Sequence, residues 1–179
     1  MLIETKRLKL RPFDHNDLDI IMKLYSDEEI MEYMPGPVMD HEMARQQLSK
    51  FVAGWELTPQ INYEMAVEWR ETGETIGRAE ITRNYSQESA MIGWMLIKSA
   101  WGKGCATEIA HALIDYCFKE MYLHRVYALC HPGNTASWKV MEKCGMHKEA
   151  HYIQKCKYIR AGKVRWEDEL EYAVINTEA

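Results

Sequence analysis

The stretch Lys98–Glu108, KSAWGKGCATE, decides how the rest of this chain is interpreted. An apolar run, MIGWMLI, precedes it and a long amphipathic pattern follows it, so the stretch predicts a turn from a strand into a helix. Gly102 and Gly104 let the backbone approach an anion without a Cβ atom in the way, and the first N–H groups of a helix attract phosphates. The stretch is therefore either a phosphate site or a tight turn that needs glycine.

The spacing of the glycines excludes two well-known phosphate loops. A Walker A loop needs glycine where Ile97 stands, and serine or threonine where Gly104 stands. A dinucleotide-binding turn needs a third glycine at the position of Thr107. If the turn holds a phosphate, the phosphate belongs to another kind of molecule.

The composition is that of one globular domain, which we expect to span residues 1–179. A net charge of −5 without a basic cluster argues against nucleic acid and favours cationic small molecules or basic peptide ends as partners. No apolar stretch approaches the roughly 18 residues of a membrane span, and the charged start does not resemble a signal peptide. The five cysteines are scattered and the seven histidines lack metal-ligand spacing, so we expect a cytoplasmic protein without a metal.

The order of patterns along the chain predicts an α+β (mixed α/β) fold, with a mostly antiparallel central sheet flanked by helices. The expected strands are Leu2–Phe13, Tyr63–Arg70, Thr75–Arg83, Ala90–Ile97, Val126–Cys130, Tyr152–Ile159 and Val164–Ile175. The last two strands are predicted to form a hairpin around residues 160–163. The expected helices run from Asp14 to Tyr25, near Glu28–Met34, from Asp40 to Trp55, from Ala106 to Met121 and from Thr135 to Lys143.

Further motifs surround the glycine turn in a fixed order. They are TKRLKLR at residues 5–11, IGW at 92–94, WGKGCAT at 101–107, NTAS at 134–137 and MEKCGM at 141–146. In combination they resemble the GNAT superfamily of acetyl-CoA-dependent N-acyltransferases, in particular its RimJ/RimL-type branch, which acetylates ribosomal-protein N-termini and other amines. The resemblance covers nearly the whole chain and implies the GNAT fold.

The resemblance also implies a ligand for the turn. It suggests that acetyl-CoA is the cosubstrate and that backbone N–H groups of the turn hold its pyrophosphate. Asn134 would contact the pantetheine arm or the substrate, although it is equally suited to cap the next helix. The cofactor-binding residues expected on this basis are Met95, Leu96, Ile97, Gly102, Lys103, Gly104, Cys105, Ala106, Thr107, Asn134, Lys139 and Lys143.

Transfer of an acetyl group to an amine needs a neutral amine, a donor for the carbonyl oxygen and a proton for the leaving thiolate. In the superfamily the amine attacks directly, and the donor is usually a backbone N–H, here around Met95–Leu96. Ser137 is the residue that we expect to protonate the thiolate. The expectation is strengthened because Met141 stands where many members carry a tyrosine acid.

The proton acceptor is less well defined. The RimJ/RimL-type branch often has an acidic residue just before its I-G-Y motif, but that position is Met91 here. Strand carboxylates at Glu64, Glu68 and Glu80 are the alternatives, and Glu80 is our first choice. Each of them is also explained as an ordinary solvent-facing glutamate.

Tyr33 and Trp94 are the residues that we expect to line the acceptor pocket, with core packing as the alternative for both. The predicted activity is therefore acetyl transfer from acetyl-CoA to a primary amine, either a protein N-terminus or a small amine. The alternative is a GNAT-fold regulatory module that binds acetyl-CoA without useful turnover. We expect no nucleic-acid or membrane partner, and a homodimer stays open.

Overall fold

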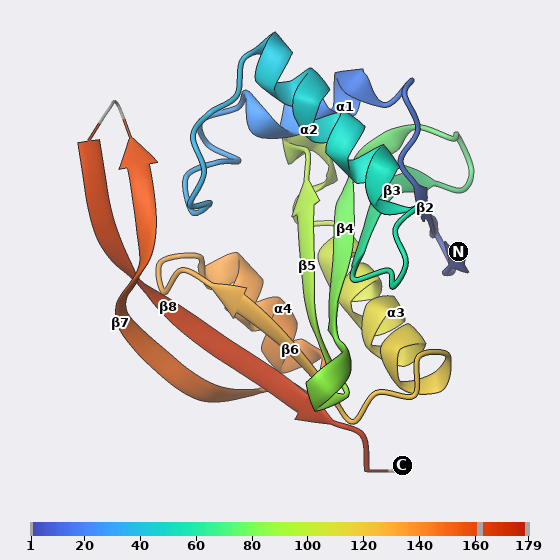
Figure 1. Cartoon of the computed structure of the whole chain (residues 1–179), viewed down its shortest axis with the longest axis vertical. Coiled ribbons are helices and arrows are strands. Elements are labelled where there is room, and N and C mark those ends of the chain that lie inside the picture. The colour runs from blue at the N-terminus through green and yellow to red at the C-terminus, as the bar shows by residue number, and fades with distance from the viewer. Residues whose placement is uncertain (1, 161–162, 178–179) are drawn as a thin grey trace.

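The eight strands of the described chain belong to one sheet, in the order β1-β2-β3-β4-β5-β6-β8-β7 (Figure 1). The computed structural model describes residues 2–160 and 163–177. All neighbouring strands are antiparallel except β5 and β6, which are parallel. The strands are β1 (Ile3–Glu4), β2 (Leu8–Pro12), β3 (Asn62–Trp69), β4 (Thr75–Asn84), β5 (Ser89–Leu96), β6 (Arg125–Cys130), β7 (His147–Arg160) and β8 (Lys163–Ile175). The predicted fold class is confirmed.

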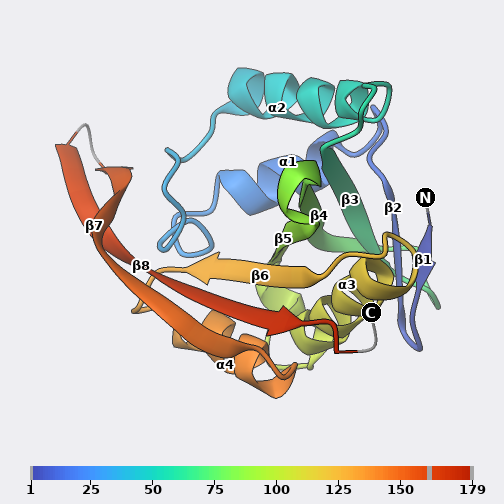
Figure 2. The same cartoon turned by 60° about the horizontal axis from the view of Figure 1, so that its bottom comes forward.

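Helices cover both faces of the sheet (Figure 2). On one face lie α1 (Leu18–Tyr25) and α2 (His41–Gly54), and on the other lie α3 (Cys105–Lys119) and α4 (Thr135–Lys143). One buried cluster fills the space between α3 and the sheet, and a second lies beneath α1 and α2. Within the described residues no helix has the length and apolar character that a membrane crossing requires.

Alternation along the central strands assigns side chains to these two faces. Met65 of β3 and Ile81 of β4 belong to the cluster beneath α3, whereas Ala66 belongs to the cluster beneath α1 and α2. Ala66 is paired with Arg78, so Arg78 faces α1 and α2 as well. Glu64 of β3 and Glu80 of β4 lie two residues from Ala66 and Arg78, so they share that face.

The first predicted strand is divided into two. Thr5 makes the division, because its backbone N–H donates to the carbonyl of Leu8 at 2.9 Å and its hydroxyl accepts from the N–H of Leu8 at 2.9 Å. The chain turns back at this point, and β1 and β2 pair as antiparallel neighbours. The continuous alternation of the sequence gives no sign of this turn.

The predicted helix boundaries are wrong at three places. The first helix begins at Leu18 rather than Asp14, because the Asp14 carboxylate accepts from the Asn16 N–H in a local turn at 2.7 Å. Residues 28–34 form turns rather than a helix. Helix α3, which follows the glycine turn, ends at Lys119 rather than Met121. Tyr122 lies just beyond it with a φ of 53°, which a continuing helix does not allow.

The closing hairpin is longer than predicted. Strand β7 starts at His147 rather than Tyr152, and its pairing with β8 shifts register between Lys148 and Ala150 and again between Tyr152 and Cys156. Bulges of this kind break the alternation that would have marked the beginning of the strand. Of the turn predicted at 160–163, residues 161 and 162 lie outside the described residues.

Candidate active site

The sheet divides where β5 meets β6. These parallel strands pair only over Ser89–Met91 and Arg125–Tyr127, and then they diverge toward their carboxyl ends (Figure 1). On its other side, β5 stays paired with β4 along its whole length. Among the described strands, none pairs with the second edge of β5 beyond Met91.

The free edge exposes backbone groups of alternate residues. The N–H of Ile97 donates to the carbonyl of Ile76 at 3.0 Å, and therefore points toward β4. Because the direction alternates along an antiparallel strand, the N–H groups of Leu96 and Trp94 point the other way, to the free edge. Of the strand-end residues expected to bind the cofactor, Leu96 has its amide there, whereas the amide of Ile97 is used within the sheet.

The glycine turn follows directly from this edge. Gly102 has a φ of 69° and Gly104 a φ of 77°, a region that favours glycine. A Cβ atom on Gly102 would have no atom within 4 Å, so the turn is open to a ligand. The first hydrogen bond of α3 runs from the N–H of Glu108 to the carbonyl of Gly104 at 3.1 Å. The amides of residues 105–107 precede it and lack helical acceptors, as an anion site requires.

Arg7 holds the turn from outside. Its Nη1 donates to the carbonyl of Lys103 at 2.9 Å, and its Nε donates to the Glu108 carboxylate at 2.7 Å. Thr5 donates its hydroxyl to the same carboxylate at 2.5 Å. The hydrogen bond to Glu108 raises the pKa of Arg7 above its ordinary value. Sequence reasoning did not assign Arg7 to the site, and the only signal was its place in the TKRLKLR motif.

The start of α4 carries the two polar candidates. The Asn134 side chain accepts from the N–H of Ser137 at 3.1 Å, so Asn134 is the N-cap of α4. Both side chains are half-buried. The far end of the helix returns to the glycine turn, because the Cys144 thiol lies 3.7 Å from the carbonyl of Thr107. The C-terminal end of α4 therefore packs beside the start of α3.

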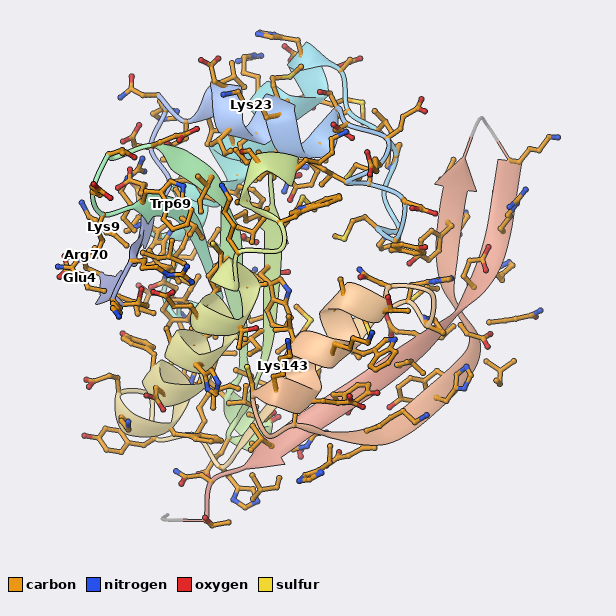
Figure 3. The ribbon with its side chains drawn as sticks, turned by 180° about the vertical axis from the view of Figure 1, so that it is seen from behind. Glu4, Lys9, Lys23, Trp69, Arg70 and Lys143 are labelled. Atoms are coloured by element: carbon orange, nitrogen blue, oxygen red, sulfur yellow. The ribbon has the colours of Figure 1, made fainter. Side chains whose placement is uncertain are left out.

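The three lysines expected near the phosphates are all exposed. Lys143 is in the last turn of α4, next to Cys144, and Figure 3 labels it there. Lys139 lies one turn earlier on the same helix, with its Nζ 5.6 Å from the ring centre of Trp138. Lys103 is within the turn itself. Lys103 thus belongs to the turn, and Lys143 is next to the residue that contacts it.

A buried ionic cluster joins β3 and β4 beneath α1 and α2. Nε and Nη2 of Arg78 donate to the two carboxylate oxygens of Glu64 at 2.7 and 2.9 Å, and Nη2 also donates to Glu80 at 2.5 Å. The guanidinium lies 5.0 Å from the ring centre of Phe51. Glu68, the third carboxylate considered, is instead held by Arg11 at 2.6 Å.

Burial and charge act against each other in this cluster. Burial opposes the charged form of Arg78, but Glu80, Tyr25 and Glu64 outweigh it and raise its pKa above the ordinary value. Burial also raises the pKa of Glu64, against the opposing effect of Arg78. The pKa of the Tyr25 phenol rises to about 12 because it is buried. The cluster therefore holds its cation firmly.

The two expected acceptor residues lie on different elements and have different neighbours. Tyr33 follows α1, and its ring stacks on His131 with centroids 5.2 Å apart. The Tyr158 hydroxyl of the closing hairpin donates to the carbonyl of Tyr33 at 2.9 Å. Trp94 instead packs against the core cluster beneath α3. Trp94 and Tyr33 therefore have different neighbours.

The cysteines are poor nucleophiles. Burial raises the pKa of Cys105, the cysteine of the glycine turn. It raises the pKa of Cys117 and Cys130 to about 12 and that of Cys144 and Cys156 to about 11. All five therefore stay protonated near neutral pH, which agrees with a mechanism that needs no enzyme thiolate.

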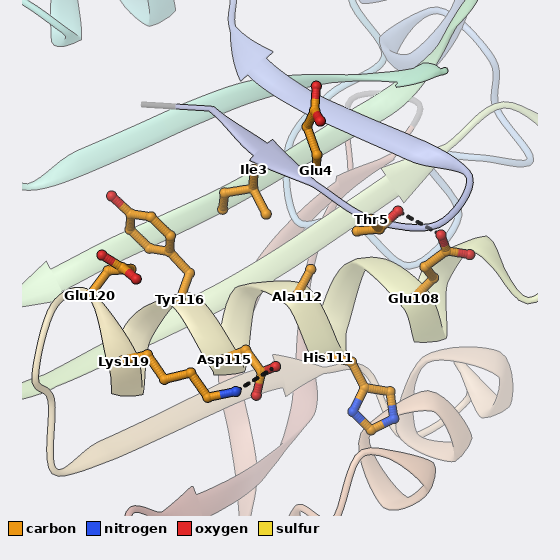
Figure 4. Close-up of a pocket in the computed structure, with 10 residues that line it drawn as sticks. All are labelled: Ile3, Glu4, Thr5, Glu108, His111, Ala112, Asp115, Tyr116, Lys119 and Glu120. Atoms are coloured by element: carbon orange, nitrogen blue, oxygen red, sulfur yellow. Dashed lines mark hydrogen bonds and ion pairs between the residues drawn. The ribbon is translucent and has the colours of Figure 1, made fainter. Parts of the chain in front are cut away.

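Two surface hollows border this site, one reaching Glu108 at the start of α3 and the other reaching Ile97 at the end of β5. One, of about 480 Å³, runs between β1 and α3 and is lined by residues such as Glu4, His111 and Tyr116 (Figure 4). The other, of about 500 Å³, lies beside Lys23, Asp27 and Lys98. Neither includes Asn134, Ser137 or Glu80, so neither defines the chemistry. Within the described residues, no three His, Cys, Asp or Glu side chains are grouped as metal ligands.

Comparison with known proteins agrees with the geometry. The family model described as an acetyltransferase (GNAT) domain matches residues 7–147. The uncharacterized N-acetyltransferase YnaD of Bacillus subtilis is 35% identical over 179 residues, 99% of each chain. The crystal structure of a GNAT-family acetyltransferase from Bacillus anthracis is similar, with a TM-score of 0.84, 32% identity and coverage of 98% of each chain.

The fold, the site and these relatives define an acyltransferase enzyme. The chain belongs to the GNAT acetyltransferase family, which uses acetyl-CoA. The fold is also shared by a spermidine N-acetyltransferase from Vibrio cholerae, solved with CoA and spermine, with a TM-score of 0.81. That match covers 97% of this chain and 98% of the other at 22% identity, so it supports the fold alone.

Proposed function

We propose that this enzyme transfers the acetyl group of acetyl-CoA to a primary amine by direct attack in a ternary complex. The observation that carries the proposal is the continuity of the free β5 edge with the glycine turn. Amides at Trp94 and Leu96 lead into the unpaired amides at the start of α3. An amide-containing arm that ends in phosphates fits such an arrangement.

The residues present suit both the pantetheine arm and the pyrophosphate of acetyl-CoA. A strand edge pairs with an added chain through its backbone groups, as the amides of a pantetheine arm would require. The positive-φ glycines and the helix N-terminus suit the pyrophosphate, with Lys103, Lys139 and Lys143 as the nearby cations. When bound, acetyl-CoA supplies the thioester from which the acetyl group is transferred.

Protons must be moved on both sides of the reaction. An acceptor ammonium gives up one proton to a carboxylate, for which Glu80 is the proposed acceptor. The nitrogen then forms a bond to the acetyl carbon as the C–S bond breaks. Ser137 is proposed to pass a proton to the thiolate and to regain one from solvent or from the amine nitrogen. In balance, one ammonium and one thioester give an amide, a thiol and one proton.

The charge of the segment between α1 and α2 favours a cationic acceptor. Residues 26–40 include five carboxylates and no lysine or arginine. Lys98 pairs with two of them, Asp27 at 2.8 Å and Glu29 at 2.9 Å. Glu32 lies beside Tyr33 and raises the pKa of that phenol. This charge and the ordered motifs support a RimJ/RimL-type activity on a protein N-terminus or a small amine.

Two missing side chains favour a second candidate function. Met141 stands where many family members have a tyrosine acid, and it is 1% exposed within the core. Met91 replaces the acid expected before the IGW motif. A chain without either group is also suited to a regulatory module that binds acetyl-CoA without useful turnover.

Two measurements separate these functions. Acetyl-CoA at 100 times its Kd stabilises a protein by about 2.7 kcal/mol, which for this size raises Tm by roughly 5–11 °C. Release of free thiol is then followed with spermidine, single amino-acid amides and peptides with free N-termini. Binding with acceptor-dependent release supports the enzyme, and binding without release for any amine supports the module. No rise in Tm at saturation would contradict both.

A further inference from the structure

Gly93 leaves a space over β5 that the carboxylate of Glu80 fills. Glu80 of β4 is paired with Gly93 of β5, so both positions lie on the face that α1 and α2 cover. A Cβ atom on Gly93 would stand 2.5 Å from Oε1 of Glu80 and 3.1 Å from its Cγ. The Glu80 side chain therefore lies across the neighbouring strand, and a larger residue at position 93 would displace it.

Arg78 prevents Glu80 from simply moving aside. Its Nη2 is shared between Oε2 of Glu80 and Oε1 of Glu64, while its Nε holds the other oxygen of Glu64. The Arg78 side chain is only 8% exposed and lies against Phe51, so it has little room to follow. Glu80 is thus held through one oxygen. No described residue donates a hydrogen bond to the other, Oε1.

This free oxygen lies on the same face of the sheet as the position of the missing acid. Met91, where an acidic residue would have been expected, is paired with Thr82, and Gly93 is two residues further along β5. Met91 and Gly93 therefore face the same side of the sheet. The carboxylate that reaches over Gly93 comes from the neighbouring strand, on the face that the side chain of residue 91 also occupies.

We propose that Gly93 and Arg78 are positioning residues that hold Glu80 over β5 as the proton acceptor for the amine. The inference rests on the proposed function and adds the two residues that make Glu80 effective. Oε1 takes one proton from the acceptor ammonium, and the freed lone pair forms the C–N bond as the C–S bond breaks. A second proton leaves the nitrogen, and the thiolate gains a proton through Ser137 to become a thiol. Glu80 then releases the proton to solvent, so the carboxylate is restored.

A double-mutant cycle tests the role of Gly93. Glu80→Gln keeps the size of the side chain but not its basicity, and we expect kcat/KM to fall by about 10²-fold. Gly93→Ala should lower kcat/KM by about 10-fold or more, with the Kd of acetyl-CoA unchanged. In the Glu80→Gln background the glycine substitution should change kcat/KM by less than about twofold, because its target is already lost. Independent, multiplicative losses would overturn the inference.

A second pair of variants covers the case in which Gly93→Ala does not fold. Glu80→Asp withdraws the carboxylate by one methylene and so makes room for the Cβ atom at position 93. We expect the double variant Glu80→Asp with Gly93→Ala to fold and to be as active as Glu80→Asp alone. A double variant that is less stable or less active than Glu80→Asp would contradict the steric link. Glu149→Gln, an exposed glutamate of β7 that pairs with Arg125 away from this cluster, is the control and should leave kcat/KM unchanged.

The role of Arg78 is tested through the pH profile. The groups facing Glu80 are Arg78 on its own strand, Glu64 on β3 and Tyr25 on α1, while α2 contributes the uncharged Phe51. Arg78→Lys replaces the fork by a single ammonium group and stabilises the carboxylate anions less. We therefore expect the acidic limb of the kcat/KM profile to move to higher pH, with acetyl-CoA binding retained. If the acidic limb of the Arg78→Lys profile stays at the wild-type pH, Arg78 is not a positioning residue for Glu80.

These outcomes are distinguishable from failure of the proposed function itself. If wild-type protein transfers acetyl groups to no amine, both the function and the positioning of its base are contradicted. If wild-type protein is active but the cycle is multiplicative, only the positioning inference fails.

Discussion

At the scale of single residues, Arg7 shows what a sequence motif leaves out. Its guanidinium reaches the carbonyl of Lys103 and the carboxylate of Glu108, about a hundred positions further along the chain. The positive φ of Gly102 and Gly104 was predictable, because glycine alone adopts that backbone freely. The partner of Arg7 was not, because it depends on how the turn after β1 is placed against α3.

Replacing Arg7 by Met should weaken CoA binding selectively. The substitution keeps an apolar stem beside Trp69, but it frees the Lys103 carbonyl and the Glu108 carboxylate. A charge-assisted hydrogen bond contributes about 1.5–3 kcal/mol, and the 41% exposure of Arg7 reduces this, so we expect a rise in Kd of about 10-fold. Calorimetry with CoA and with pantetheine, which lacks the pyrophosphate, measures the effect.

The control for Arg7 is Arg70→Met. Arg70 donates to the carbonyl of Thr5 at 2.6 Å and so supports the same turn without touching the glycine loop. It should leave the Kd of CoA unchanged. Equal losses for both variants, or for CoA and pantetheine alike, would mean that the turn matters only for stability.

Ser137→Ala tests the proposed acid. The hydroxyl is half-buried in the first turn of α4, and its backbone N–H rather than its side chain makes the capping bond. Loss of a general acid lowers a rate by about 10²-fold or more, so kcat should fall while the Kd of acetyl-CoA changes little. Steady-state kinetics with calorimetry checks this. An unchanged kcat would exclude Ser137 from the mechanism.

At the scale of elements, the sequence predicted what periodicity controls. The central strands and the core of each helix were predicted because apolar residues recur with the period of each structure. The predicted element boundaries were wrong where local hydrogen bonds interrupt a continuing sequence pattern. The hydrogen bond between Leu8 and Thr5, which separates β1 from β2, is an example. The pairing of only three residues between β5 and β6 had no sequence signal, although it creates the free edge.

Asn134 has two roles that a pair of cap variants can separate. Asn134 and Asp40 cap α4 and α2 in the same way, each accepting from the N–H three residues later. Substitution of either by Ala should lower the free energy of unfolding by about 1 kcal/mol, measured by urea denaturation. Only Asn134→Ala should also weaken acetyl-CoA binding. If both variants keep wild-type affinity, Asn134 serves as a cap alone.

At the scale of the whole molecule, the site is a division of one sheet into two parts. Strands β1–β5 lie on one side of the division, and β6, β7 and β8 lie on the other. The α3 helix crosses from β5 to β6, and its N-terminus lies where the free edge ends. A ligand held at this edge contacts backbone groups rather than particular side chains. Because a substitution leaves the backbone groups in place, side-chain variants are a poor test of binding at this edge.

Hydrogen exchange can test the free edge directly, because it reports each amide separately. Before binding, the amides of Trp94 and Leu96 should exchange quickly, while those of Gly93 and Met95, which point toward β4, should be protected. At 100 times the Kd, acetyl-CoA should slow exchange at the two edge amides by up to about 100-fold and leave the other two unchanged. The alternation is the distinguishing feature, since general stabilisation would slow all four amides together. Uniform slowing, or none, would mean that the ligand does not pair with this edge.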